Sequence, residues 1–151
     1  MSNEFSWNKK NVLVTGISGF LAPHIAEKLS NLGANVIGSV HDYKKIDYGK
    51  ITGLYEKITV AQADINDLTR LEEIVANYEI DYIFHCAANS IVRQCATNPV
   101  GCFQTNIIGT MNVLEAARRV GGVKGIACME SDKSYGSFDP EDLPYKEGQA
   151  I

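Results

Sequence analysis

Short apolar runs and longer segments with helical periodicity alternate along most of the chain. Five apolar runs have the length and composition of buried parallel strands, and they cover residues 11–15, 35–40, 58–63, 81–86 and 123–128. Between them, apolar residues recur at three- and four-residue spacing, which predicts helices at 20–32, 68–78 and 99–120. Because the crossovers are long enough to join parallel strands, the pattern predicts a doubly wound α/β fold with a parallel sheet.

The last predicted helix is the longest, and its ends are well marked. Asn98 is a typical N-cap with Pro99 in the first helical position, and Gly121 follows the last turn. The inward face of this helix is expected to carry Phe103, Ile107, Met111, Leu114 and Ala117. Two stretches lack a period: 41–57 is expected to be a loop with a short helix, and the residues after Met129 are expected to form an unfinished loop.

Composition and charge exclude several classes of function. The 151 residues suffice for one domain with a core, and the net charge of -4 with a pI near 5.3 favours neither nucleic acid nor a membrane as partner. The four cysteines form no C-x-x-C motif and no zinc spacing with histidine, so we expect no metal site and a reducing compartment, with Cys86 and Cys128 as core residues. No stretch reaches membrane-spanning length, and the N-terminus lacks the apolar core of a signal peptide. These features predict a soluble, cytoplasmic protein.

A glycine-containing turn joins the first predicted strand to the first helix. Its spacing from Gly16 to Ala22 is G-x-x-G-x-x-A, and no P-loop lysine follows. Glycines here let the backbone turn sharply and approach a pyrophosphate, whose charge is met by the helix N-terminus. The turn predicts a Rossmann-type, dinucleotide-binding domain; the alternative is a purely structural turn. The expected cofactor contacts are Gly16, Ser18, Gly19, Phe20 and Leu21.

An acidic residue, Asp42, ends the second predicted strand. A carboxylate in that position accepts hydrogen bonds from the adenosine ribose and repels the 2′-phosphate of NADP. NAD is therefore the expected cofactor, although Lys44 and Lys45 stand nearby and a basic residue could reach such a phosphate.

Three further motifs follow in order along the chain. They are Asp64-Ile65 after the third strand, Phe84-His-Cys-Ala-Ala88 at the fourth, and Thr105-Asn-Ile-Ile-Gly-Thr110 inside the long helix. Together with the turn and Asp42, they resemble the extended short-chain dehydrogenase/reductase family, whose members are nucleotide-sugar epimerases, dehydratases and reductases. The resemblance covers residues 10–136.

The resemblance implies roles for several of these residues. Asp64 and Ile65 would hold the adenine ring, Ala87 and Ala88 would let their loop lie close to the cofactor, and Asn106 would bond the neighbouring backbone. His85 is expected to be a hydrogen-bonded histidine at a strand end and not a base. The resemblance also implies a nucleotide-diphosphate-sugar substrate and a homodimer when the protein is full length.

The fifth strand leads into Ser131, Asp132 and Lys133. By the resemblance, Ser131 would hydrogen-bond the sugar 4-hydroxyl, and the acid followed by lysine is similar to the pair in 4,6-dehydratases, above all the CDP-glucose group. Such an enzyme oxidises C4, eliminates water across C5 and C6, and returns the hydride to C6. Asp132 would be the acid for the departing hydroxyl, and Lys133 the base or its assistant, with a lowered pKa.

Two other hypotheses remain open at this point. The protein could be an epimerase or reductase of the same family, in which the Asp-Lys pair is incidental, or a non-catalytic dinucleotide-binding module. The family's catalysis also needs Tyr-x-x-x-Lys, and none of the seven tyrosines has a lysine four residues later. We therefore expect residues 1–151 to be an NAD-binding domain, incomplete at the C-terminus, that stops before this pair and the substrate domain and is inactive as it stands.

Overall fold

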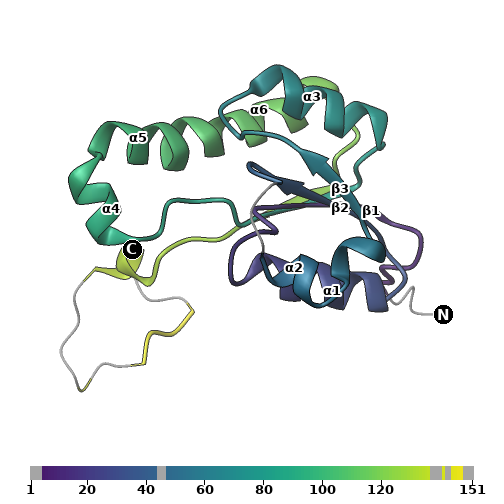
Figure 1. Cartoon of the computed structure of the whole chain (residues 1–151), viewed down its shortest axis with the longest axis horizontal. Coiled ribbons are helices and arrows are strands. Elements are labelled where there is room, and N and C mark those ends of the chain that lie inside the picture. Colours follow the sequence, from purple (N-terminus) through teal and green to yellow (C-terminus); the bar gives the residue numbers. More distant parts are fainter. Residues whose placement is uncertain (1–4, 44–46, 137–140, 142–143, 148–151) are drawn as a thin grey trace.

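The computed structural model describes residues 5–43, 47–136, 141 and 144–147, and its centre is a five-stranded parallel sheet (Figure 1). The strands are β1 (Asn11–Thr15), β2 (Asn35–Val40), β3 (Thr59–Gln62), β4 (Tyr82–His85) and β5 (Gly125–Cys128). Their order is β3-β2-β1-β4-β5, and every neighbouring pair is parallel. Since the order reverses at β1, this is a doubly wound, Rossmann-type sheet, and the predicted fold class is confirmed.

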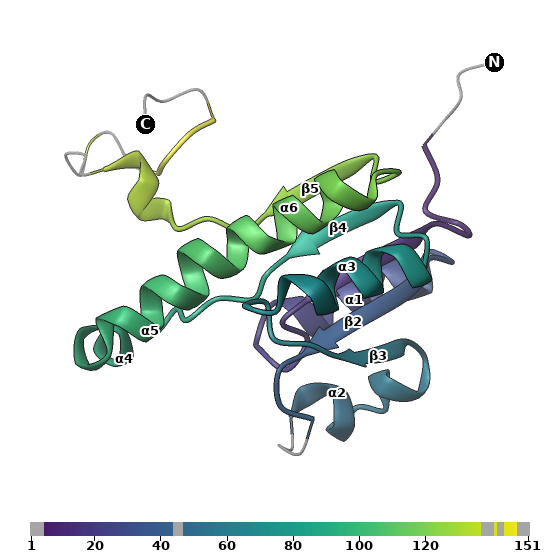
Figure 2. The same cartoon turned by 90° about the horizontal axis from the view of Figure 1, so that it is seen from above.

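Helices cover both faces of the sheet (Figures 1 and 2). One face carries α1 (Ala22–Asn31) and α2 (Tyr48–Ile51), and the other carries α3 (Leu68–Asn77) and α6 (Thr110–Val120). A rod formed by α5 (Pro99–Phe103), the π-helical η2 (Gln104–Gly109) and α6 extends, with α4 (Val92–Thr97), beyond the carboxyl ends of the strands. Short 3-10 helices are η1 (Leu54–Glu56) and η3 (Asp132–Tyr135).

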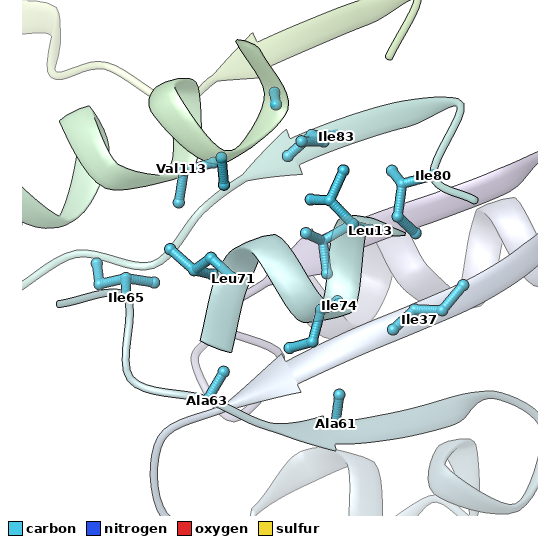
Figure 3. Packing of buried hydrophobic residues seen from close by; sticks show 13 residues of the cluster. Leu13, Ile37, Ala61, Ala63, Ile65, Leu71, Ile74, Ile80, Ile83 and Val113 are labelled. Carbon is cyan, nitrogen blue, oxygen red and sulfur yellow. The ribbon is translucent and has the colours of Figure 1, made fainter. Parts of the chain in front are cut away.

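Side chains of β1 alternate between the two faces and divide the core into two layers. Leu13 belongs to the cluster under α3 and α6 with Ile74 and Val113 (Figure 3), whereas Val12 belongs to the cluster under α1 with Leu29. Both layers are buried, which is why most positions of the strands are apolar. Packing on both sides fixes the strand ends and therefore the loops that leave them.

The inward face predicted for the long helix is wrong at four of its five positions. Phe103, Ile107, Met111 and Leu114 are between 43% and 63% exposed, and only Ala117 of the five is buried. The buried face carries Cys102, Gly109, Asn112, Val113 and Ala116. A Cβ on Gly109 would lie 2.5 Å from Ile65 Cδ1, so the close approach of the rod selects small residues on this face. The larger apolar side chains form a second, open face.

The segment before the rod also differs from expectation. Residues 92–97 form α4 where a loop was expected, and Cys95 of α4 is joined to Cys102 of α5 by a disulfide, although reduced thiols were expected. Asn98 brings the two helices together, because its side chain caps α5 by accepting from Gly101 N at 3.1 Å. Cys86 and Cys128 are free and half-buried.

Membrane-spanning helices and metal-binding clusters are both absent from the described residues. No helix among them is long and apolar enough to cross a membrane, and no group of three or more His, Cys, Asp or Glu side chains among them is placed to hold a metal ion.

Candidate functional site

The turn after β1 is fixed by the strand beside it. Gly16 N and Ile17 N both donate to Ser39 O of β2, at 3.0 and 3.1 Å, and Gly19 N donates to Gly16 O at 2.9 Å. Gly16 has φ +76°, and a Cβ on it would lie 2.8 Å from Ala87 Cα. The position therefore needs glycine both for its backbone angle and for its contact with the loop after β4.

A cleft of about 490 Å³ opens at the carboxyl ends of these strands. Its walls include seven of the predicted cofactor contacts: Gly16, Ser18, Gly19, Asp64, Ile65, Ala87 and Ala88. Three chain segments that are far apart in the sequence thus meet at the point where the strand order reverses. In a doubly wound sheet, this crevice is where ligands bind, and its volume suits a small-molecule site, typically ~300–1,000 Å³.

Three predicted contacts lie outside the wall of the cleft. Phe20 is 88% exposed and packs against the ring of His24, and Leu21 is the N-cap residue of α1. Asp42 stands two residues after β2; its neighbour His41 lines the cleft, with Nδ1 3.4 Å from Asp64 Oδ2. Cofactor contacts by Phe20, Leu21 and Asp42 stay predictions.

Several lining residues were missed by sequence reasoning: Ser39, His41, Asn66, Cys86, Asn89, Ser90, Ile91, Gln94 and Thr105. Many of them belong to α4 and the segment before it, which carry no helical periodicity in the sequence. The Asn106 motif offered one usable signal, since its expected partner is the backbone of a neighbouring loop.

Asp64 and Ile65 are held in place by α6 and by their own turn. Asp64 Oδ1 accepts from Asn66 N at 2.8 Å, which closes a tight turn after β3. Ile65 O accepts from the buried Asn112 Nδ2 at 3.1 Å, and its side chain rests on Gly109. The loop that forms this wall is therefore positioned by the rod.

A buried hydrogen-bonded chain crosses the base of the cleft. Thr15 Oγ1 lies 2.8 Å from His85 Nδ1, and His85 Nε2 lies 3.0 Å from Thr110 Oγ1. Thr15 Oγ1 also accepts from Cys86 N and Ala87 N, both at 3.1 Å. Burial lowers the pKa of His85 below its ordinary value. The prediction that His85 is a hydrogen-bonded strand-end residue is confirmed.

Asn106, in the π-helical segment, forms two side-chain hydrogen bonds with the loop after β4. Its Oδ1 accepts from Asn89 N at 2.7 Å, and its Nδ2 donates to Asn89 O at 3.0 Å. This confirms the role that the resemblance implied for Asn106. A π-helical turn often marks a functional position, and here it turns a side chain of the rod toward the cleft loop.

Ser131, Asp132 and Lys133 follow β5; Ser131 caps η3, and Asp132 and Lys133 are its first two residues. Ser131 Oγ accepts from Lys133 N at 3.2 Å and donates to Asp132 Oδ1 at 3.3 Å. All three residues are exposed and lie outside the lining of the cleft. Because β5 is parallel to β4, they stand at the same edge of the sheet as the cleft.

Comparison with known proteins supports this reading of the fold and motifs. The family described as GDP-mannose 4,6-dehydratase matches residues 13–151. CDP-glucose 4,6-dehydratase of Salmonella typhimurium is 32% identical over 130 residues, which cover 85% of this chain and 36% of the relative. UDP-glucuronate 4-epimerase 2 of Arabidopsis thaliana is 30% identical over 134 residues, which cover 85% of this chain and 31% of the relative. The chain thus spans about a third of the length of these relatives.

A solved structure shows the same architecture. The crystal structure of UDP-glucose 4-epimerase from Bifidobacterium longum in complex with NAD+ and UDP superposes with a TM-score of 0.80 at 26% identity, covering 93% of this chain and 42% of that chain. Fold, motifs and family match agree. The chain belongs to the extended short-chain dehydrogenase/reductase family, which contains the nucleotide-sugar epimerases and dehydratases.

Proposed function

We propose that the cleft holds NAD, with the pyrophosphate on the turn from Gly16 to Gly19 and the adenine ring beside Asp64 and Ile65. The observation that carries this proposal is the fit of Gly16 against Ala87, where any side chain would push the glycine turn away from the loop after β4 and so displace the backbone that would face a pyrophosphate. The N-terminus of α1 follows the turn without a side-chain cap, so its N–H groups and dipole can meet a phosphate. The related epimerase structure holds NAD+. Held by these residues, NAD would supply a reversible hydride acceptor for the substrate.

A preference for NAD over NADP is part of the proposal. Asp42 follows β2, whose end forms part of the cleft through Ser39. A carboxylate there bonds the ribose hydroxyls and repels a 2′-phosphate. Titration of the full-length protein with both cofactors tests this: NAD should bind more tightly, and equal or tighter binding of NADP would contradict it.

The reaction that we propose for the full-length protein is a nucleotide-sugar 4,6-dehydration in the cytoplasm. Ser131 binds the sugar 4-hydroxyl, Asp132 protonates the departing 6-hydroxyl, and Lys133 assists removal of the C5 proton. Support comes from the order Ser-Asp-Lys after β5, at the edge of the sheet where the cleft opens. The relative that is a CDP-glucose 4,6-dehydratase points to the same chemistry.

The roles proposed for Asp132 and Lys133 can be tested in variants of the full-length protein whose reaction stops after the first hydride transfer. In Asp132→Asn and Lys133→Met, the first hydride transfer should persist while elimination slows, typically ~100- to 10,000-fold for one acid–base group. NADH absorbance should therefore appear and remain, with little 4-keto-6-deoxy product, whereas Ser131→Ala should impair NADH formation itself. Product at wild-type rates from both the Asp132 and Lys133 variants would contradict the dehydratase assignment.

The second candidate is a nucleotide-sugar epimerase. It is favoured by the relative that is a UDP-glucuronate 4-epimerase, at nearly the same identity as the dehydratase, and by the related epimerase structure. An epimerase inverts C4 without losing water, so incubation with several nucleotide sugars separates the two candidates. A 4-keto-6-deoxy product indicates the dehydratase, and an interconverted pair of C4 isomers indicates the epimerase.

A homodimer of the full-length protein completes the proposal. Its support is the open apolar face of the rod, which consists of Val100, Phe103, Ile107, Met111 and Leu114. These residues recur at three- and four-residue spacing, as they do on a helix that packs against another helix. Ile107→Glu should convert a dimer to a monomer in analytical ultracentrifugation, whereas Gln62→Glu, on the opposite edge strand, should not. A wild-type monomer would contradict the dimer.

A further inference from the structure

The donor and acceptor roles along the buried chain at the base of the cleft can be assigned from its geometry. Thr110 Oγ1 donates its hydrogen to Asn106 O at 2.8 Å, so it can only accept from His85 Nε2. Nε2 must therefore carry the ring proton, which leaves Nδ1 as an acceptor. Thr15 Oγ1 accepts from two amides and has one hydrogen left, which points to Nδ1 at 2.8 Å.

With this assignment, the hydroxyls of Thr15 and Thr110 and both ring nitrogens of His85 each have a hydrogen-bond partner. The two lone pairs of Thr15 Oγ1 hold Cys86 N and Ala87 N, and Ala87 is the residue against which Gly16 packs. The orientation of the Thr15 hydroxyl is decided by the bare Nδ1 of His85, because no other acceptor for the Thr15 hydroxyl hydrogen is found among the described residues. His85 is therefore not part of the cleft lining, but it is linked to the wall of the cleft through Thr15.

We infer that His85 is a positioning residue for the cofactor: as the neutral Nε2–H tautomer, it orients the Thr15 hydroxyl so that Thr15 fixes the Cys86 and Ala87 amides against the glycine turn. This inference deepens the proposed NAD site and rests on it where cofactor affinity is concerned.

Protonation of His85 is incompatible with this arrangement. An imidazolium carries a hydrogen on Nδ1, which would face the hydrogen of Thr15 and force that hydroxyl to rotate away from the two amides. Titratable thiols stand beside His85 in Cys86, the next residue, and in Cys128, its partner in β5, whereas the hydrogen-bond partners Thr15 and Thr110 do not titrate. Burial raises the pKa of both thiols, and burial is also what lowers the pKa of His85. At neutral pH the ring is neutral, and the arrangement fails as the pH falls through this depressed pKa.

Two substitutions of His85 distinguish a positioning role of its ring nitrogens from simple filling of space. Asn in place of His85 keeps an acceptor near the site of Nδ1 and cannot be protonated, whereas Gln keeps a donor near the site of Nε2 and loses that acceptor. The NAD affinity of His85→Asn should stay within about threefold of the wild-type affinity at neutral pH. In this variant, the affinity should no longer fall as the pH drops through the pKa of His85. His85→Gln should bind about tenfold more weakly, the change expected for loss of one buried hydrogen bond, ~1–1.5 kcal/mol.

The experiment combines NMR of the full-length protein with NAD titration. Long-range ¹H–¹⁵N spectra should show His85 as the Nε2–H tautomer, and the Cys86 and Ala87 amides should exchange at least tenfold faster in His85→Gln than in His85→Asn. In a Thr15→Val background, His85→Gln should change neither exchange nor affinity further, because His85 acts through Thr15. An Nδ1–H tautomer, or equal exchange in the two His85 variants, would overturn the inference. If the wild type does not bind NAD, the cofactor proposal fails, while the tautomer and exchange results still decide the role of His85.

Discussion

The cleft at the carboxyl ends of the strands and the segment from Ser131 to Lys133 lie at the same edge of the sheet, but they are held in different ways. Thr15, Ser39 and His85, at the base of the cleft, are buried and bonded to backbone or to each other. Ser131 and Lys133 are exposed and joined by a local side-chain-to-backbone bond. The shape of the cleft is therefore set by buried, hydrogen-bonded residues of the sheet. The residues proposed for the chemistry are instead placed mainly by the local course of the chain after β5. Substitutions should affect the two regions differently.

The largest effect on NAD binding is expected at the glycine turn, where a matched control exists. Gly16 and Gly121 have the same φ, +76°, but a Cβ on Gly16 meets Ala87, whereas a Cβ on Gly121 meets nothing within 4 Å. Alanine should cost each protein ~1–3 kcal/mol of stability through backbone strain. Only Gly16→Ala should also weaken NAD binding, by roughly 10- to 100-fold, since the displaced turn loses charge-assisted hydrogen bonds.

Calorimetric titration and thermal unfolding of both variants test this difference. Equal NAD affinity in Gly16→Ala and Gly121→Ala would show that the glycine turn is not the phosphate site.

A smaller effect is expected where the wall of the cleft meets β2. Asp42→Ala should weaken NAD binding by about 1–2 kcal/mol, or roughly 5- to 30-fold, and narrow the preference over NADP. Asp67→Ala is the control, because Asp67 caps α3 by accepting from Arg70 N and lies outside the cleft lining. It should lower stability by ~0.5–2 kcal/mol without changing affinity. Unchanged NAD affinity in Asp42→Ala would remove Asp42 from the site.

The smallest effect is expected on the free energy of unfolding when a residue of the exposed segment is replaced. Lys133→Met should change the free energy of unfolding by no more than ~0.5 kcal/mol, as for other exposed residues, even though turnover falls. Chemical denaturation of the variant measures this. A loss of more than about 2 kcal/mol would mean that Lys133 is part of the folded core and would end the contrast between the two regions.

The sequence predicts the sheet well because its signals are local and repeated. Alternating strands and helices, the glycine turn and the Asp64-Ile65 step are each encoded within a few residues, and the cleft forms where they meet. The role of Asn106 was implied by the family resemblance, and its amide does bond a neighbouring loop.

The failures involve features that depend on tertiary contacts. Phe103 and Ile107 were assigned to the core from their helical spacing, but the rod approaches Ile65 so closely that Gly109 occupies the packing face. The α4 helix was missed because none of its residues is buried, so no apolar stripe marks it. The pairing of Cys95 with Cys102 depends on the fold-back at Asn98, which spacing alone does not reveal.

A crystal structure of the protein with NAD would test the central claim most directly. The account predicts the pyrophosphate against the N–H groups of the Gly16–Gly19 turn and the N-terminus of α1, with the adenine ring beside Asp64 and Ile65. Cofactor bound elsewhere, or no cofactor in the cleft at saturating NAD, would contradict it.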